Sequence, residues 1–361
     1  MRAVDHPEQM DAVLAAALRV GINHIETAPA YGPAERFLGQ ALARLQHHAP
    51  ATRASLVLTS KLRPGSPLPQ GQEQLRALLH RLGVERLDNL AVHGLNTADD
   101  LEWSLRGPGA DLMRWALGEG LVGQVGFSSH GSPALIASAL ASGRFRFCAL
   151  HLHLFDQERL PLAKAALAAG LGVLAISPAD KGGRLYDPPP ELLADCQPFH
   201  PLELAYRFLL EQGISTLTLG AAQPADLIWA ERLAAADDPG SRLSPGVLDQ
   251  ALERLVLAAG QRLGPERCGQ CRACLPCPEE VPIPALLRLR NLAVGHGMEV
   301  FASERYNLIG RAGAWWEQRD ASACERCGDC LPRCPLSLPI PELLADTHRR
   351  LVAAPRRRLW G

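Results

Sequence analysis

The sequence predicts an α/β protein, in which a TIM-type (β/α)8 barrel whose first strand is missing from this chain precedes a small, mostly α-helical domain. Three observations lead to this fold class. Seven short apolar segments alternate with amphipathic helical segments, which is typical of parallel strands joined by crossover helices. No dinucleotide-binding glycine fingerprint follows the first of them, which favours a barrel over an open doubly wound sheet. Eight of the ten cysteines then fall in two runs near the C-terminus.

The predicted strands are short and rich in apolar residues, and each is followed by a helical stretch such as Ala34–Leu45 or Pro224–Ala235. They cover Asn23–Thr27, Leu56–Lys61, Leu87–His93, Val122–Phe127, Phe147–His153, Gly172–Ser177 and Ser215–Gly220. Seven strands leave two unpaired edges in a barrel, which is costly. We therefore expect the native start upstream of Met1, or a segment or second chain that covers the gap.

A long helical segment, Pro245–Gly264, separates the barrel from the cysteines. We expect a barrel domain over 1–240, a connecting helix over 241–264 and the cysteine-rich domain over 265–361. The segment between the two cysteine runs, Ile283–Ser303 especially, has a helical pattern. The last domain should therefore be mostly helical.

The cysteine runs have the close spacing with which thiolates surround an iron–sulfur cluster, and a proline follows each run. Structural zinc is the main alternative, but zinc sites usually join two separated Cys-x-x-Cys pairs. Disulfides would need an oxidising compartment, and the polar stretch Met1–Asp11 does not read as an export signal. The runs consist of Cys268, Cys271, Cys274 and Cys277, and of Cys324, Cys327, Cys330 and Cys334.

The second run resembles the bacterial ferredoxin pattern, and the first is one residue shorter before its last cysteine. That resemblance implies two 4Fe-4S clusters. It also implies that the last cysteine of each run crosses to the other cluster. The implied ligand sets are Cys268, Cys271, Cys274 with Cys334, and Cys324, Cys327, Cys330 with Cys277.

Net charge and hydropathy limit the kinds of partner that this chain is expected to bind. The net charge is −1, which argues against a nucleic-acid or membrane-surface partner. No apolar stretch approaches the ~18 residues of a membrane span. We expect a soluble cytoplasmic protein that acts on a small molecule.

Polar side chains at three successive strand ends indicate a catalytic site, because the active sites of such barrels lie at the C-terminal face. Glu26 lies near the end of the first predicted strand and Tyr31 follows that strand, while Lys61 ends the second strand and His93 ends the third. Only three of the 37 basic Lys and Arg residues are lysines, so a lysine here suggests a role for a compact charge. Taken singly, Lys61 could be an ordinary surface lysine and His93 an ordinary core histidine. Because the polar residues occupy three successive strand ends, a shared functional site is the better interpretation.

Gly21–Gly32, Leu58–Lys61 and the His93 strand resemble the signature blocks of the aldo/keto reductase family, and the similarity continues to about residue 236. The whole chain resembles the branch fused to a ferredoxin-like domain. The resemblance implies a catalytic tetrad of Glu26, Tyr31, Lys61 and His93, in which Glu26 replaces an aspartate. It further implies carbonyl reduction, or alcohol oxidation, with NAD(P)H.

The same resemblance implies the cofactor site. Ser128 and Ser129 would hold the nicotinamide, although an asparagine is usual at the second position. The pyrophosphate would lie on Ser177, Lys181 and Gly182 together with Gly220 and Ala221. Asp226 stands where an arginine often meets the 2′-phosphate, so NADH, or another redox partner, becomes plausible in place of NADPH.

Iron–sulfur clusters exchange single electrons, whereas nicotinamide gives a hydride. Three interpretations stay open. The barrel could be a carbonyl reductase with structural or sensing clusters. It could hold a flavin, or a radical-tolerant substrate, that the clusters feed from a partner ferredoxin. It could also have lost its chemistry and serve electron transfer or assembly. The set of Tyr31, Lys61 and His93 favours an enzyme.

Overall fold

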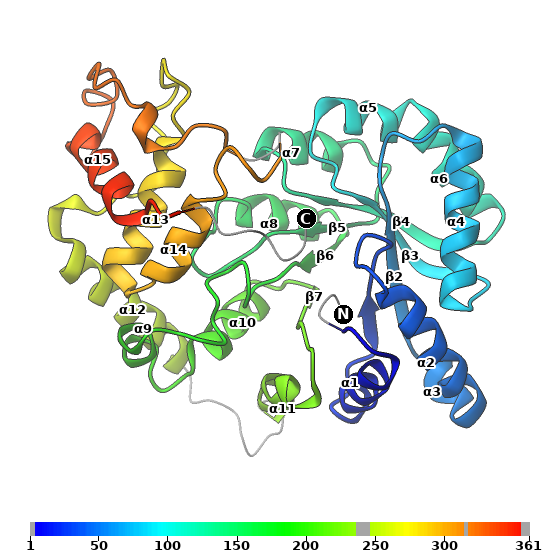
Figure 1. Cartoon of the computed structure of the whole chain (residues 1–361). Helices are drawn as coiled ribbons and strands as arrows, with labels where there is room; N and C mark the ends of the chain where they lie inside the picture. Colours follow the sequence, from blue (N-terminus) through cyan, green and yellow to red (C-terminus); the bar gives the residue numbers. More distant parts are fainter. Residues whose placement is uncertain (1–3, 236–245, 314–316, 355–361) are drawn as a thin grey trace. The chain divides into compact units, whose positions relative to one another are not determined.

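The computed structural model describes residues 4–235, 246–313 and 317–354 (Figure 1). These residues form two compact units. The first runs to Gly182 and resumes at Ala205, and the second contains Gly183–Leu204 and the described residues from 246 onward. No helix in the described ranges is long and apolar enough to cross a membrane.

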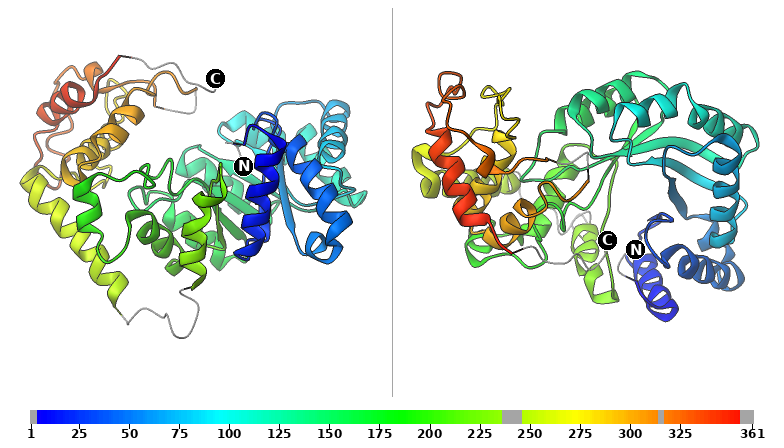
Figure 2. Two further views of the ribbon diagram at one scale, coloured as in Figure 1. Left: turned by 60° about the horizontal axis from the view of Figure 1, so that its bottom comes forward. Right: turned by 45° about the horizontal axis from the view of Figure 1, so that its top comes forward.

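The first unit contains a seven-stranded parallel sheet in which every strand pairs with the next in sequence, and its helices cover the outside of the curved sheet (Figures 1 and 2). The strands are β1 (His24–Glu26), β2 (Val57–Leu62), β3 (Leu87–His93), β4 (Val122–Ser129), β5 (Phe147–Leu150), β6 (Gly172–Ala175) and β7 (Thr216–Leu217). The helices are α1 (Pro7–Arg19), α2 (Ala34–His48), α3 (Pro50–Ala54), α4 (Leu68–Leu82), α5 (Ala98–Leu105), α6 (Pro108–Gly118), α7 (Pro133–Ala141), α8 (Leu160–Ala168), the 3-10 turn η1 (Pro224–Leu227) and α11 (Ile228–Ala235), while α10 (Pro201–Glu211) begins in the second unit.

All seven strands lie where the sequence predicts them, but four of them, β1, β5, β6 and β7, end earlier than predicted. β5 stops at Leu150 because the chain turns back at a bridge between His153 and Asp156. β6 stops at Ala175, and Ser177 then adopts a left-handed φ of 52°. These turns place the segments after the strands at the carboxyl edge of the sheet.

Helix α4 shows how the outer layer packs. It buries Leu75, Leu78, Leu79 and Leu82, the spacing of one helical face, and ends at Gly83, whose φ is +64°. Gly39 of α2 lies so close to α4 that an added Cβ would stand 2.1 Å from the Arg81 carbonyl oxygen. A side chain at that position would force the two helices apart.

Strands β1 and β7 form the two ends of the sheet, and within the described residues the barrel is therefore a parallel-strand half-barrel. The helical layer continues between them. Val13, Ala16 and Ala17 of α1 form one buried cluster with Ala221 and Leu227. Helix α1 thus contacts η1 without an eighth strand among the described residues.

The second unit contains helices and loops, and no strand among its described residues (Figure 2). It contains α9 (Pro190–Asp195), α12 (Val247–Leu263), η2 (Gly264–Glu266), α13 (Ile283–His296), α14 (Glu299–Tyr306), η3 (Ala321–Ala323) and α15 (Ile340–Leu351). The predicted helix Ile283–Ser303 is divided in two at Gly297, whose φ is +66°. Helix α13 packs against α12, α14 and α15.

One segment that we expected in the barrel domain, over residues 1–240, belongs to the second unit instead. Gly183–Leu204 belongs with the second unit, where α9 packs against α12 and the guanidinium of Arg262 binds Asp195 at 2.5 and 2.9 Å. The predicted limit between residues 240 and 241 lies outside the described residues. The domain bounds otherwise stay a prediction.

An internal repeat organises the second unit. The first three cysteines of each run have the same spacing, and Val281–Leu287 and Leu338–Leu344 share the pattern x-Pro-Ile-Pro-x-Leu-Leu. The prolines that precede α13 and α15 have nearly equal backbone angles, with φ −77°, ψ 63° at Pro282 and φ −75°, ψ 69° at Pro339. Each cysteine loop is thus followed by an equivalent helix.

Candidate functional site

The strands of the first unit direct alternate side chains to the interior of the half-barrel. His24, Thr59 and Asn89 line a cavity at the amino ends of β1, β2 and β3. Side chains two or four residues further along a strand face the same side. Glu26, Lys61 and His93 therefore reach the interior at the carboxyl ends.

The structure brings all four residues of the predicted tetrad together. Lys61, which is 2% exposed, forms an ion pair with Glu26. Its Nζ also donates a hydrogen bond to the phenol oxygen of Tyr31 at 2.9 Å and to the carbonyl oxygen of Thr27 at 3.3 Å. The Tyr31 hydroxyl lies 3.3 Å from Glu26 Oε1. One ammonium thus organises the phenol and the carboxylate.

The electrostatic environment of Lys61 is unusual. Burial, and secondarily the positive charge of Lys181, lowers the pKa of Lys61 to about 7. The adjacent Glu26 carboxylate opposes that shift, because it favours the ammonium form. A lysine with this pKa can gain or lose a proton near neutral pH.

His93 completes the group from the end of β3. Its ring meets the Tyr31 ring edge to face, with centroids 5.9 Å apart. The next residue, Gly94, donates its N–H to Ser128 Oγ at 3.0 Å, which ties the end of β3 to the end of β4. The imidazole and the phenol therefore border the same interior space.

Ser128 and Ser129, the predicted nicotinamide contacts, are buried and already bonded to the protein backbone. Ser128 Oγ accepts the Gly94 N–H, and Ser129 Oγ donates to the Leu95 carbonyl at 2.6 Å while accepting the Gly131 N–H at 2.9 Å. These hydroxyls fit a role in fixing the strand ends better than one in holding a carboxamide.

The loop after β6 presents a charge rather than an open backbone cradle. Ser177 donates its N–H to Thr218 Oγ1 at 2.7 Å, and a Cβ on Gly182 would lie 1.9 Å from the Pro178 carbonyl oxygen. The ammonium of Lys181 acts on both Lys61 and His151. This loop can therefore offer an anion the charge of Lys181.

The loop after β7 is capped by a carboxylate. Asp226 accepts the backbone N–H groups of Ala222 at 2.8 Å and of Gln223 at 3.1 Å. Gly220 borders open space, since an added Cβ would meet no atom within 4 Å. Gly220 leaves room for a phosphate, whereas Ala221 is packed in the buried cluster with α1. Asp226 occupies the N–H groups of Ala222 and Gln223 and adds a negative charge.

A histidine cluster at the ends of β4 and β5 was not predicted. His151 Nε2 lies 3.1 Å from His130 Nε2, and the His151 and His153 ring centroids are 5.6 Å apart. Burial, followed by the charges of neighbouring cations, keeps the pKa of His151 well below its usual value. The signal was present as the His-x-His pattern directly after a strand.

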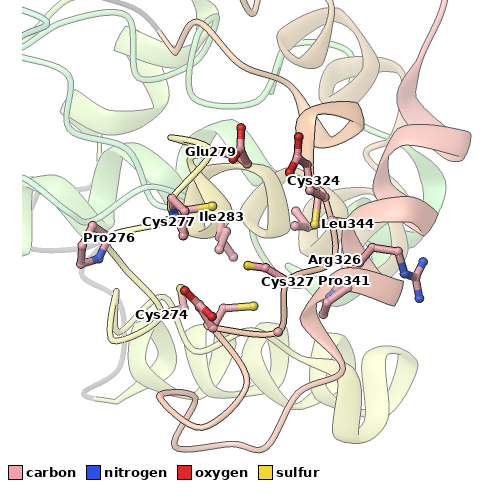
Figure 3. A pocket seen from close by; sticks show the side chains of 15 residues that line it. Cys274, Pro276, Cys277, Glu279, Ile283, Cys324, Arg326, Cys327, Pro341 and Leu344 are labelled. Carbon is pink, nitrogen blue, oxygen red and sulfur yellow. The ribbon is translucent and has the colours of Figure 1, made fainter.

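In the second unit, five cysteines line one cavity, and the thiols of Cys277, Cys324 and Cys327 point toward a common space (Figure 3). The other two are Cys274 and Cys330. The described residues contain no group of three or more His, Cys, Asp or Glu side chains arranged to hold a single metal ion. All eight cysteines of the runs are free thiols.

Electrostatic neighbours show which thiols lie close together. Burial raises the pKa of Cys268, and Cys271 and Cys334 add to that shift. Burial likewise raises the pKa of Cys330, with further contributions from Cys324, Cys327 and Cys277. In each case the last cysteine of the other run is among the neighbours. The thiols therefore gather across the runs.

Residues 2–188 match the aldo/keto reductase family. The chain belongs to the aldo/keto reductase family. It is accordingly an oxidoreductase. No curated protein is significantly similar to it in sequence.

Solved aldo/keto reductases share the fold of the first unit. An enzyme from Bacillus halodurans in its holo form is 20% identical, with a TM-score of 0.56 over 70% of this chain and 89% of its own. A Pseudomonas aeruginosa protein described as a putative aldo-keto reductase is 23% identical, with a TM-score of 0.51 over 65% and 86%. A Bombyx mori aldo-keto reductase in complex with NADP is 20% identical, with a TM-score of 0.53 over 69% and 84%.

Proposed function

We propose that this aldo/keto reductase reduces the carbonyl group of a small molecule, or oxidises the corresponding alcohol, and carries two 4Fe-4S clusters in its second unit. The observation that carries the reductase assignment is the hydrogen bond between Lys61 and Tyr31 beside a paired Glu26. This arrangement places a cation against a phenol in the interior of a parallel half-barrel, where the phenol can take part in proton transfer.

Tyr31 is the proton donor. An unperturbed tyrosine titrates near pH ~10, and a neighbouring ammonium stabilises its tyrosinate form. Lys61 supplies that charge at 2.9 Å, while Glu26 holds Lys61 in place. The phenol can then pass its proton to the oxygen of the carbonyl and recover it in the reverse reaction.

His93 orients the carbonyl. Its ring borders the Tyr31 ring, so a carbonyl oxygen that approaches the phenol also meets the imidazole. A hydrogen bond from His93 would stabilise the negative charge that develops on that oxygen.

A bound reduced nicotinamide would supply the hydride. Lys181 and the open space at Gly220 suit its pyrophosphate, but the Asp226 carboxylate does not suit a 2′-phosphate. We therefore propose NADH in place of NADPH as the cofactor of this chain.

The thiol neighbours support two clusters with crossed ligands. Cys268 and Cys271 would join Cys334, and Cys324, Cys327 and Cys330 would join Cys277. Cys274 lies near Cys268 and Cys271 and also near Cys330, and the ferredoxin resemblance assigns it to the first set. Asn291 holds the first loop, since its Nδ2 donates to the Cys268 carbonyl at 2.8 Å. Because each cluster takes one electron at a time, a partner protein rather than nicotinamide would exchange electrons with them.

A second candidate follows from the engaged hydroxyls of Ser128 and Ser129. If these groups never turn to a carboxamide, a flavin in the barrel, fed by the clusters, becomes the alternative to nicotinamide. Such a cofactor could convert single electrons into a two-electron step.

One experiment tests the proposal and separates the candidates. Anaerobically reconstituted protein is mixed with NADH or NADPH and a panel of aldehydes and ketones, while cofactor oxidation and cluster absorbance are followed together. Carbonyl-dependent oxidation of NADH supports the reductase. Bleaching of the clusters only when a flavin or a ferredoxin is added supports the second candidate. Protein that binds neither iron nor sulfide excludes the clusters.

A further inference from the structure

We infer that the two clusters differ in reduction potential, and that the cluster on Cys268, Cys271, Cys274 and Cys334 has the higher potential. An electron held by the second unit then rests on that cluster. This inference rests on the proposed function, because it requires both clusters. Two independent features of the loops point in the same direction.

The first feature is an unused hydrogen-bond donor. Gln270 lies between Cys268 and Cys271 in a left-handed conformation, with φ +59°. Its side chain lies against the Cys268 thiol, and its amide nitrogen Nε2 is buried without a hydrogen-bond partner of good geometry. A thiolate or sulfide beside it would accept that N–H. Such a bond favours the reduced cluster, which carries more negative charge, and raises its potential.

The repeat makes the comparison direct. The residue equivalent to Gln270 in the second run is Arg326, which has the same φ of +59°. The Arg326 side chain is exposed and forms an ion pair with Glu342, so it is directed away from the thiols. The second cluster therefore lacks the buried amide donor.

The second feature is charge. The cavity that is lined by all four proposed ligands of the second cluster, and by Cys274 of the first, is also lined by three carboxylates, Glu279, Glu325 and Asp329, and by the paired Arg326. Negative charge opposes the addition of an electron and lowers the potential of this cluster. Solvent screens Glu325 and Asp329, which are exposed, so their effect is moderate.

The loop of the first run carries the opposite charge. Arg267 precedes Cys268 and Arg272 follows Cys271. Arg333 donates to the Pro276 carbonyl at 2.8 Å and so lies between the two runs, where it favours neither cluster. Charge and hydrogen bonding thus separate the potentials in the same sense.

The order sets a direction for electron flow. An electron that reaches the cluster of the second run would pass on to the cluster of the first run. Cys327 and Cys271 are the exposed cysteines of the two runs. Each cluster therefore has one ligand at the surface, at which an electron can enter or leave.

The test uses the full chain, reconstituted anaerobically with iron and sulfide and titrated from oxidised to reduced with electron paramagnetic resonance as the readout. We expect two one-electron waves whose reduction equilibrium constants differ at least tenfold, or ~59 mV for one electron. Gln270→Leu should move only the upper wave, to lower potential. Replacing Glu279, Glu325 and Asp329 by their amides should move only the lower wave, to higher potential.

Glu253→Gln removes an exposed acid of α12 and serves as the matched control, with both waves unchanged. A single unresolved wave would overturn the inference, as would a carboxylate variant that moves the upper wave. If Gln270→Leu fails to bind iron, the carboxylate variant alone decides. Wild-type protein without iron and sulfide would instead contradict the proposed function, so the two failures are distinguishable.

Discussion

Lys61 and Tyr31 meet at 2.9 Å although they come from different elements, the end of β2 and the loop after β1. The parallel pairing of Glu26 with Thr59 sets the register that makes this contact possible. Lys61 lies two residues beyond Thr59 and therefore reaches past the end of β1, where the chain turns toward Tyr31. The contact depends on strand register and not only on the identity of the two residues.

The pH dependence of reduction should follow the charge of Lys61. Since burial lowers the pKa of Lys61 to about 7, its ammonium is lost as the pH rises through that value. The turnover number for carbonyl reduction should therefore fall above about pH 7, by roughly tenfold per pH unit. A pH profile of kcat under saturating cofactor measures this decrease, which is the alkaline limb of the profile. A flat profile from pH 6 to 9 would contradict it.

Two variants should shift the alkaline limb of the kcat profile in opposite directions along the pH axis. Glu26→Gln removes the carboxylate that favours the ammonium, so the limb should shift to lower pH. Lys181→Gln removes the cation that lowers the pKa of Lys61, so the limb should shift to higher pH. Profiles of kcat for the two variants in parallel give the comparison, and shifts of the same sign would refute the assignment.

Cofactor preference should depend on Asp226. Asp226→Ser removes the negative charge and frees the N–H groups of Ala222 and Gln223. The ratio of kcat/KM for NADPH to that for NADH should rise at least tenfold. Glu231→Ser, in the following helix α11, is the matched control and should leave the ratio unchanged. Wild-type protein that already prefers NADPH would contradict the role given to Asp226.

Crossed ligation can be decided by double variants. Cys277→Ser with Cys324→Ser should remove ligands from one cluster and leave about half of the iron. Cys334→Ser with Cys324→Ser should damage both clusters and leave almost none. Iron and acid-labile sulfide per chain are the measurements. The reverse pattern would show that each run ligates its own cluster.

A buried ion pair should stabilise the second unit. Arg290 of α13 is 5% exposed and its Nε donates to Asp346 of α15 at 2.8 Å. Asp346→Ala should lower the free energy of unfolding by about 3 kcal/mol, because it leaves a buried guanidinium short of a partner. Glu342→Ala breaks the exposed pair with Arg326 and should cost less than about 1 kcal/mol. Urea unfolding of the two variants would contradict this if the costs were equal.

The strands were predictable because each is a short apolar segment, but their ends were not. His151 and His153 continue the alternation of β5, yet the backbone turns back at the His153–Asp156 bridge. The assignment of Gly183–Leu204 was also missed. It depends on the ion pair of Asp195 with Arg262, and a contact between residues so distant in sequence leaves no local pattern.

The proximity of Glu26, Tyr31, Lys61 and His93 could be expected because polar residues stand at successive strand ends, and the family resemblance named them as a tetrad. Their catalytic role stays a prediction. The repulsion of a 2′-phosphate by Asp226 was also predicted, but its capping of two N–H groups was not. A Gln-Pro-Ala-Asp sequence at a helix start was the available signal. The repeat of Val281–Leu287 in Leu338–Leu344 is visible in the sequence, whereas the burial of the Gln270 amide needed the folded loop.

The most direct test of the reductase assignment is the turnover of Tyr31→Phe. With NADH and an aldehyde that the wild type reduces, the variant should lose at least about 10²-fold in kcat, since a positioned acid contributes ~10²–10⁴. Its iron and sulfide content should be unchanged, because Tyr31 and the cysteines belong to different units. A variant that turns over at the wild-type rate would show that the Tyr31 hydroxyl is not the proton donor.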